Sequence, residues 1–179
     1  MKTRLTIRFP VLFFFAFIVA MAFIISADAA EDNPNIPIQH ANQNSIKTCF
    51  LTIREVSNFL IENSDHSAKS TWNLNSPDQR LFNSLIIKQY ADAQTIITFN
   101  VTPTGVNTCD TSYQEIFYFN KSCAVSREEI FKAWKYNGDL KGVLYLSNDE
   151  GNIDLYLMPA GTGCIVVRQE VVYTIKDTK

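Results

Sequence analysis

The sequence has no run of five or more like charges, and it contains only six glycines and six prolines among 179 residues. With a net charge of −2, it offers no basic surface that would make a nucleic-acid backbone or an anionic membrane the main partner. The low glycine and proline content, without any repeating period, excludes collagen, coiled-coil and low-complexity architectures. The hydrophobic share of 46% therefore indicates a folded core, and the length allows one globular domain.

The one long apolar run of the sequence lies at its N-terminus. Three basic residues within positions 1–8 precede an uncharged stretch from Phe9 to Ile25, and the small residues Ala27 and Ala29 follow. This order is typical of a secretory signal peptide, so we predict residues 1–29 as the leader, with cleavage after Ala29. Cleavage changes the net charge to −4 and leaves no other apolar run of membrane length. The mature domain is therefore predicted to be exported, either periplasmic or extracellular, and not embedded in a membrane.

Cysteine pairs that could hold a metal are missing, because no C-x-x-C motif occurs and the two histidines have no second ligand at helical spacing. An even number of cysteines in an exported chain instead predicts two disulfides, and the sequence indicates no metal or cofactor. Three pairings are possible. A bond between the second and third cysteines requires a short intervening strand, since eight extended residues span about 27 Å. The pairing stays open for Cys49, Cys109, Cys123 and Cys164.

The first half of the mature chain predicts helices. Residues 30–47 lack a hydrophobic period and are expected to form a flexible segment before a globular domain over 48–179. Apolar residues at steps of three and four, with a capping box at Thr52–Glu55, predict a helix over 52–62. Residues 63–75 are polar and predict a loop. A second helix over 77–90 is predicted from Ser76 and Pro77 at its start.

The second half predicts strands. Alternation over 97–101 and the β-branched and aromatic run 113–119 predict two strands, and a capping box at Ser126–Glu129 predicts a helix ending near Gly138. Three further strands are expected at 143–147, 153–158 and 164–174, the first two joined by a hairpin loop. The order α-α-β-β-α-β-β-β predicts an α+β fold with a mainly antiparallel sheet of about five strands, covered by about three helices and braced by disulfides.

Four aromatic residues of the second half suggest specific roles. Phe117, Tyr118 and Phe119 are consecutive in a predicted strand, so they must face both sides of it and are candidates for a binding surface. Trp134 lies one helical turn after Ile130, and we expect it to be the main apolar contact between the third helix and the sheet.

No set of residues in the sequence has the spacing of a known catalytic site. We therefore predict no catalytic residues and favour a small exported binding or interaction protein, whose partner is a protein or a small molecule. An exported hydrolase is the alternative, with Asp65, His66 and the acids of residues 148–154 as its candidates. A second alternative is a component of an envelope or secretion assembly, in which the segment from Phe9 to Ile25 is retained as an anchor.

Overall fold

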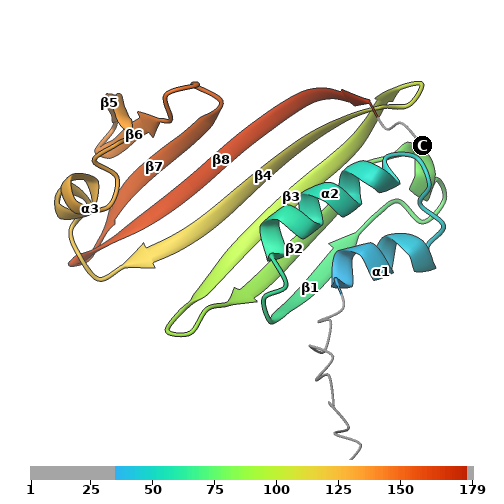
Figure 1. Cartoon of the computed structure of the whole chain (residues 1–179), viewed down its shortest axis with the longest axis horizontal. Helices are drawn as coiled ribbons and strands as arrows, with labels where there is room; N and C mark the ends of the chain where they lie inside the picture. Colours follow the sequence, from blue (N-terminus) through green and yellow to red (C-terminus); the bar gives the residue numbers. More distant parts are fainter. Residues whose placement is uncertain (1–34, 177–179) are drawn as a thin grey trace, which may run out of the picture. The chain divides into compact units, whose positions relative to one another are not determined.

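An antiparallel β-sheet of eight strands dominates the computed structural model, which describes residues 35–176 (Figure 1). The strand order is β1-β2-β3-β4-β8-β7-β6-β5. The strands are β1 (His66–Thr71), β2 (Phe82–Gln89), β3 (Gln94–Gly105), β4 (Thr108–Phe119), β5 (Lys135–Leu140), β6 (Val143–Ser147), β7 (Ile153–Ala160) and β8 (Gly163–Lys176). The helices among these residues are α1 (Ile36–Gln43), α2 (Phe50–Ile61), α3 (Cys123–Glu129) and the 3₁₀ turn η1 (Pro77–Gln79). The predicted antiparallel α+β class and three α-helices are confirmed, but the estimate of about five strands is too low.

Residues 36–43 form helix α1, so the expectation of an irregular segment over 30–47 does not hold there. The side chain of Asn35 caps this helix by accepting a hydrogen bond from the Ile38 amide, and Pro37 occupies the first turn, where its missing N–H costs nothing. Ala41 is fully buried against the first core. The predicted leader, residues 1–29, lies outside the described residues.

Helix α2 matches the predicted helix over 52–62 but starts two residues earlier. The predicted capping box at Thr52–Glu55 is wrong, because the cap position is Cys49, which has a left-handed backbone and makes no side-chain capping bond. The Cys49 sulfur is bonded instead to Cys109 at the start of β4. A covalent bond to the sheet thus fixes the N-terminal end of α2.

Strands β1 and β2 replace the predicted loop over 63–75 and the predicted helix over 77–90. The helix-start pattern at Ser76 and Pro77 yields only the single turn η1. In β2 the buried positions are Phe82, Ser84, Ile86 and Lys88, a period of two, because pairing with β1 and β3 dictates the conformation.

Both hydrophobic cores lie on the same face of the sheet. Directly paired residues of antiparallel strands point to one face. The register pairs Ile97 with Glu115, Glu115 with Arg168, Arg168 with Leu155, and Leu155 with Leu146. Ile97 belongs to the first core, and Leu155 and Leu146 belong to the second. Helices α1 and α2 cover this face over β1 to β3, and α3 lies by β7 and β8 (Figure 1).

Helix α3 is shorter than predicted and occupies a different range. It starts at Cys123, capped by Ser122, and ends at Glu129 instead of continuing to Gly138. Trp134 therefore lies in the turn between α3 and β5, where it is partly buried and packs against the second core. Gly138 is not a helix cap but has a positive φ at an irregularity in the pairing of β5 with β6.

The two disulfides resolve the pairing that the sequence left open. Cys49 is bonded to Cys109 and Cys123 to Cys164, with Cα atoms 5.8 and 4.9 Å apart. The first bond joins α2 to the sheet, and the second joins the start of α3 to the start of β8. Within residues 35–176, no helix is both long and apolar enough to cross a bilayer.

Candidate functional site

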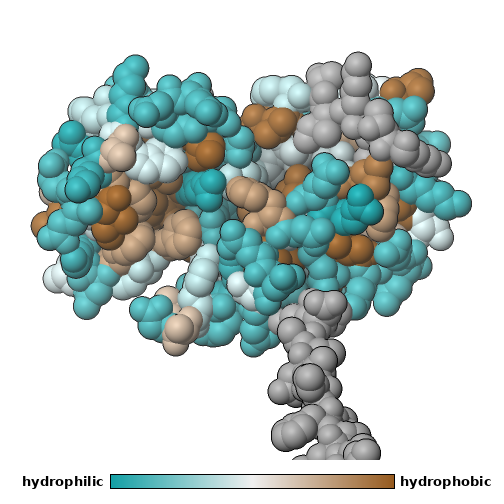
Figure 2. All heavy atoms as spheres, viewed as in Figure 1, coloured by the Kyte–Doolittle hydropathy of each residue, from teal (hydrophilic) through white to brown (hydrophobic). Residues whose placement is uncertain are grey.

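A cleft of about 210 Å³ opens on the core-bearing face, between the C-terminal end of α2 and strands β2, β4 and β8. In the space-filling view the surface is hollowed between the part covered by α2 and the part that carries α3 (Figure 2). The residues that line the cleft combine aromatic rings with four charged groups: Phe59, Leu60, Glu62, Lys88, Tyr90, Glu115, Phe117 and Arg168.

Strand register brings the charged residues together. Glu115 on β4 lies directly opposite Arg168 on β8, and both occupy positions whose side chains face the core side of the sheet. Lys88 is the last core-facing residue of β2. Because the hydrophobic cores lie on either side, these charges sit where a continuous core would otherwise bury apolar residues.

Lys88 connects the sheet to the C-terminal end of α2. Its side chain is only 3% exposed, and its ammonium donates to the main-chain oxygen of Leu60 at 2.9 Å and to the carboxylate of Glu62 at 3.1 Å. Burial alone would lower the pKa of Lys88, but the hydrogen bond to Glu62 and the contact with Tyr90 outweigh it, so the pKa is raised. A cation at the negative end of a helix dipole stabilises that end. With two hydrogen bonds and the Tyr90 ring beside it, the ammonium of Lys88 has a positioning role.

Glu115 is buried but poorly partnered. Its side chain is 8% exposed, with Oε1 3.4 Å from the Tyr90 hydroxyl and Oε2 3.7 Å from Nη1 of Arg168. Both distances exceed the 2.5 to 2.9 Å that are typical of hydrogen bonds to a carboxylate. Burial raises the pKa of Glu115, and the positive charges of Arg168 and Lys88 offset this only in part. The carboxylate thus has room for a further hydrogen-bond donor.

Arg168 is held by aromatic rings. Its guanidinium carbon lies 5.8 Å from the ring centre of Phe59 and 5.6 Å from that of Tyr113. These are cation–π distances, and such contacts hold a guanidinium without using its N–H groups. Its buried Nε has no hydrogen-bond partner among the described residues. The side chain is 29% exposed and Nη1 lies beside Oε2 of Glu115, so the outer N–H groups of Arg168 are donors next to the acceptors of Glu115.

Comparison with protein-family models, with curated proteins and with solved structures gives no match. The function is therefore argued from the geometry of the cleft.

A mostly apolar groove of about 280 Å³ lies along α2 and shares Phe59 with the cleft. The Tyr113 hydroxyl at this groove donates to Glu170 at 2.9 Å, and burial raises the pKa of Tyr113, so the hydroxyl keeps its proton. The other lining residues are Glu55, Val56, Thr111 and Val172.

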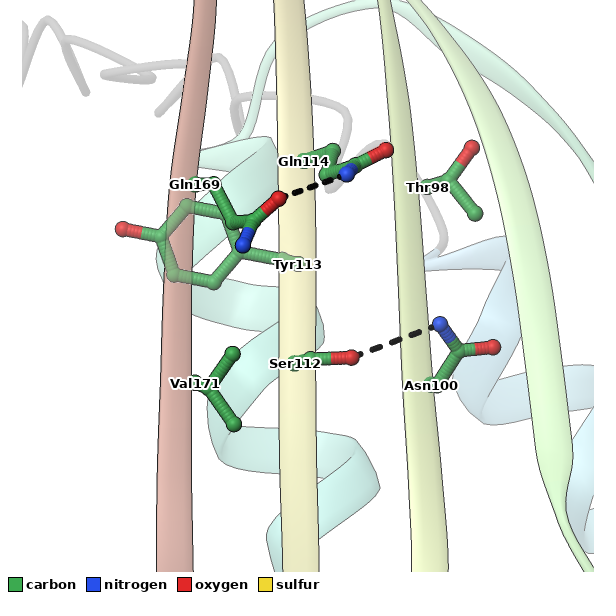
Figure 3. Close-up of a pocket in the computed structure, with 7 residues that line it drawn as sticks. All are labelled: Thr98, Asn100, Ser112, Tyr113, Gln114, Gln169 and Val171. Atoms are coloured by element: carbon green, nitrogen blue, oxygen red, sulfur yellow. Dashed lines mark hydrogen bonds between the residues drawn. The ribbon is translucent and has the colours of Figure 1, made fainter. Parts of the chain in front are cut away.

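A third hollow, on the helix-free face of the sheet, is polar and uncharged (Figure 3). Its side chains pair with one another: Gln114 donates to Gln169 at 2.7 Å, and Asn100 donates to Ser112 at 3.4 Å. Thr98 and Val171 complete its rim, and the ring of Tyr113 belongs to the opposite face, where it contacts Phe59. Because no charged residue lines it, this hollow is a weaker candidate than the cleft.

The three aromatic residues proposed as a binding surface divide between the two faces. Phe117 lines the cleft, and Phe119 packs in the second core against Phe131. Tyr118 points to the helix-free face, is 57% exposed and lies so close to Gly163 that a Cβ there would collide with its ring. A binding role for these residues stays a prediction, and only Phe117 belongs to the cleft.

The hydrolase candidates do not form a common site. His66 is buried on β1, with Nδ1 donating to the Ser64 carbonyl at 2.9 Å and Nε2 accepting from the Ile36 amide at 3.3 Å. Both ring nitrogens are therefore engaged by main-chain groups. The acids of residues 148–154 belong to the hairpin of β6 and β7, whereas β1 is the opposite edge of the sheet.

Sequence reasoning selected none of the four charged residues of the cleft, which are Glu62, Lys88, Glu115 and Arg168. Glu115 and Arg168 fall within predicted strands, at positions whose side chains face the core. A charged residue at such a position is unusual, and this was the signal in the sequence that could have revealed them. Lys88 was hidden because its segment resembled a helix. Their proximity depends on the pairing of β4 with β8, which the sequence does not reveal.

The raised pKa of Glu115 predicts a pH dependence of stability. The unfolded carboxyl has its ordinary pKa of 4.5, while the folded one holds its proton to higher pH because burial raises its pKa. The contribution of Glu115 to the free energy of unfolding is therefore fully present below pH 4.5 and is lost as the pH rises through the pKa of the folded state. We expect Glu115→Gln to remove this part of the decline, measured by denaturant unfolding between about pH 4 and 7. The exposed Glu150→Gln should retain the decline, and equal pH profiles for wild type and Glu115→Gln would contradict the assignment.

Proposed function

We propose that the protein is an exported binding protein that holds a small polar molecule in the cleft between α2 and the sheet. The observation that carries this proposal is the incomplete pairing of two neighbouring charges, Glu115 and Arg168. Buried polar groups in native structures are nearly always hydrogen-bonded, because an unpaired one costs free energy. A concave site with a few convergent polar groups among aromatic side chains is the usual form of a ligand site. A ligand in the cleft would supply a donor to the carboxylate of Glu115 and an acceptor to the outer N–H groups of Arg168.

Export is supported by the predicted leader over residues 1–29 and by the two disulfides. Disulfides persist mainly in oxidising compartments. Within residues 35–176 no cysteine is left free, and both disulfides hold covering helices on the face that carries the cleft. The oxidised fold is thus the form in which the cleft is assembled, and we place it in the periplasm or outside the cell.

The proposal predicts that a defined class of small molecules stabilises the mature protein through the cleft. We would measure the thermal midpoint with separate panels of amino acids, organic acids, amines and monosaccharides, after checking by intact mass that the oxidised protein starts at Ala30. A ligand at 100 times its Kd adds about 2.7 kcal/mol, which corresponds to roughly 5 to 10 °C for a domain of this size. Glu115→Gln and Arg168→Gln should abolish the shift.

Matched controls remove the same charges from outside the cleft. Glu150 and Arg80 are both exposed, so Glu150→Gln and Arg80→Gln should respond to ligands as the wild type does. The proposal fails if no panel shifts the wild-type midpoint, or if the two cleft variants respond as strongly as the two controls.

A further inference from the structure

The cleft offers a paired acceptor and donor, and we infer that its ligand is a zwitterionic α-amino acid with an apolar side chain. This inference rests on the proposed binding function and adds the chemical class of the ligand. The ammonium of the amino acid would donate to Glu115, and its carboxylate would accept from Arg168.

The charges of the cleft favour a ligand without net charge. Lys88 and Arg168 contribute two positive charges, and Glu62 and Glu115 contribute two negative ones. An organic anion would leave the partly buried cleft with an excess negative charge, and an organic cation would leave an excess positive one. Uncompensated charge in a partly desolvated site is costly, whereas a zwitterion preserves the balance.

The spacing of the two groups selects a ligand whose opposite charges are close together. Oε2 of Glu115 and Nη1 of Arg168 are 3.7 Å apart. In an α-amino acid both charged groups are attached to one carbon atom, so each can reach its partner from a single position in the cleft. Charge-assisted hydrogen bonds, and a bidentate contact of carboxylate with guanidinium, are the strong forms of these interactions.

The walls of the cleft indicate the side chain. Phe59 and Phe117 line the cleft together with the charged pair and present aromatic surface to it. Lys88 is already satisfied by the Leu60 carbonyl and by Glu62, so it does not demand a polar side-chain partner. Removing hydrocarbon from water would therefore add to the affinity of an aliphatic or aromatic amino acid.

Calorimetric titration of the mature, oxidised protein with matched probes tests the inference at about pH 7, where both ligand groups are charged. L-phenylalanine is compared with 3-phenylpropanoate, which lacks the ammonium, with 2-phenylethylamine, which lacks the carboxylate, and with uncharged 3-phenylpropanamide. L-leucine, 4-methylpentanoate and 3-methylbutylamine form an aliphatic series. We expect each amino acid to bind at least about tenfold more tightly than its analogues, since every analogue loses a charge-assisted hydrogen bond.

Variants assign each ligand group to its residue. Glu115→Gln should erase the preference of the protein for phenylalanine over phenylpropanoate, and Arg168→Gln should erase the preference over phenylethylamine. Arg168→Lys retains the charge but not the planar fork, so it should bind weakly. Its thermal midpoint in the absence of ligand is measured beside that of Arg168→Gln, so that a loss of binding is distinguished from a loss of folding. Glu150→Gln and Arg80→Gln should keep the wild-type ratios.

Three results would overturn the amino-acid assignment. Equal affinity for an amino acid and one of its singly charged analogues would mean that the cleft binds only the ammonium or only the carboxylate. Tightest binding of the uncharged amide would mean that the cleft recognises a neutral ligand. Failure of both amino acids to bind would reject α-amino acids as the ligand class. If another panel then shifts the thermal midpoint, and Glu115→Gln abolishes that shift, the cleft is still upheld as a binding site.

Discussion

Replacing both Cys49 and Cys109 by alanine is expected to lower the free energy of unfolding by about 4 kcal/mol. The two residues are 60 apart in sequence, and a cross-link over a loop of that length restricts the unfolded chain by about this amount. The bond also fixes the first residue before α2 to β4, so its loss frees the helix that supplies Phe59 and Glu62 to the cleft. Denaturant unfolding of the double variant and the wild type measures the difference.

The second disulfide provides the matched control for this prediction. Cys123 and Cys164 are 41 residues apart, so their removal should destabilise the protein by a similar amount, about 4 kcal/mol. This bond holds α3 by the second core and not α2. Under conditions where both variants are folded, ligand binding in the cleft should weaken only when the Cys49–Cys109 bond is absent. Equal weakening in both variants would show that α2 is not positioned by its own disulfide.

Trp134→Ala is expected to destabilise the oxidised protein by about 3 kcal/mol. Truncation of a fully buried aromatic side chain costs about 3 to 5 kcal/mol, and Trp134 is partly buried in the second core, so the lower part of this range applies. The sequence placed this residue on a helix, whereas the structure places it in the turn that follows α3. Trp134 nevertheless packs against the second core, and the predicted loss of stability depends on this contact. Thermal and denaturant unfolding would give the change in stability.

Tyr136 offers a neighbouring control for Trp134, since it is 44% exposed and belongs to strand β5. Tyr136→Ala should cost less than about 1 kcal/mol, as is usual for surface positions. If Trp134→Ala leaves the thermal midpoint within a few degrees of wild type, then Trp134 is not a core residue but a surface anchor, and the assignment to the second core is wrong.

Local sequence patterns predicted the segments whose conformation is decided by nearby residues. The strand over 143–147 has the predicted bounds, and the hairpin that follows is present between β6 and β7. These residues are mostly β-branched, aromatic or aliphatic and lie between Gly142 and the polar turn that starts at Asn148, which are local signals of a strand and its ends. Cysteine parity likewise predicted two disulfides, since it depends only on the number of cysteines and on the compartment.

Tertiary pairing decided the segments in which the local pattern was ambiguous. Leu81, Phe82, Leu85 and Ile86 suit one side of a helix, but β2 has neighbours on both edges that satisfy its backbone hydrogen bonds as a strand. Leu85 and Ile87 lie on the helix-free face, where they are partly exposed. Apolar residues therefore occupy both faces of β2, and its sequence shows no alternation of apolar and polar residues. The helix-start residues at Ser76 and Pro77 are local preferences, worth about 1 kcal/mol, which sheet pairing overrides.

Composition, residue pattern and cysteine number determined the class of the fold, the strands β6, β7 and β8 and the number of disulfides, because each depends on local or summed properties. Strand β5 was not predicted, since its residues fell in and just after the predicted third helix. Only the tertiary structure decided which cysteines pair, where Trp134 packs and which charges share a cleft. Glu115 and Arg168 are distant in sequence and meet because β4 and β8 pair in one particular register. A shift of one residue would point their side chains to the helix-free face, and register is set by the packing of the whole sheet.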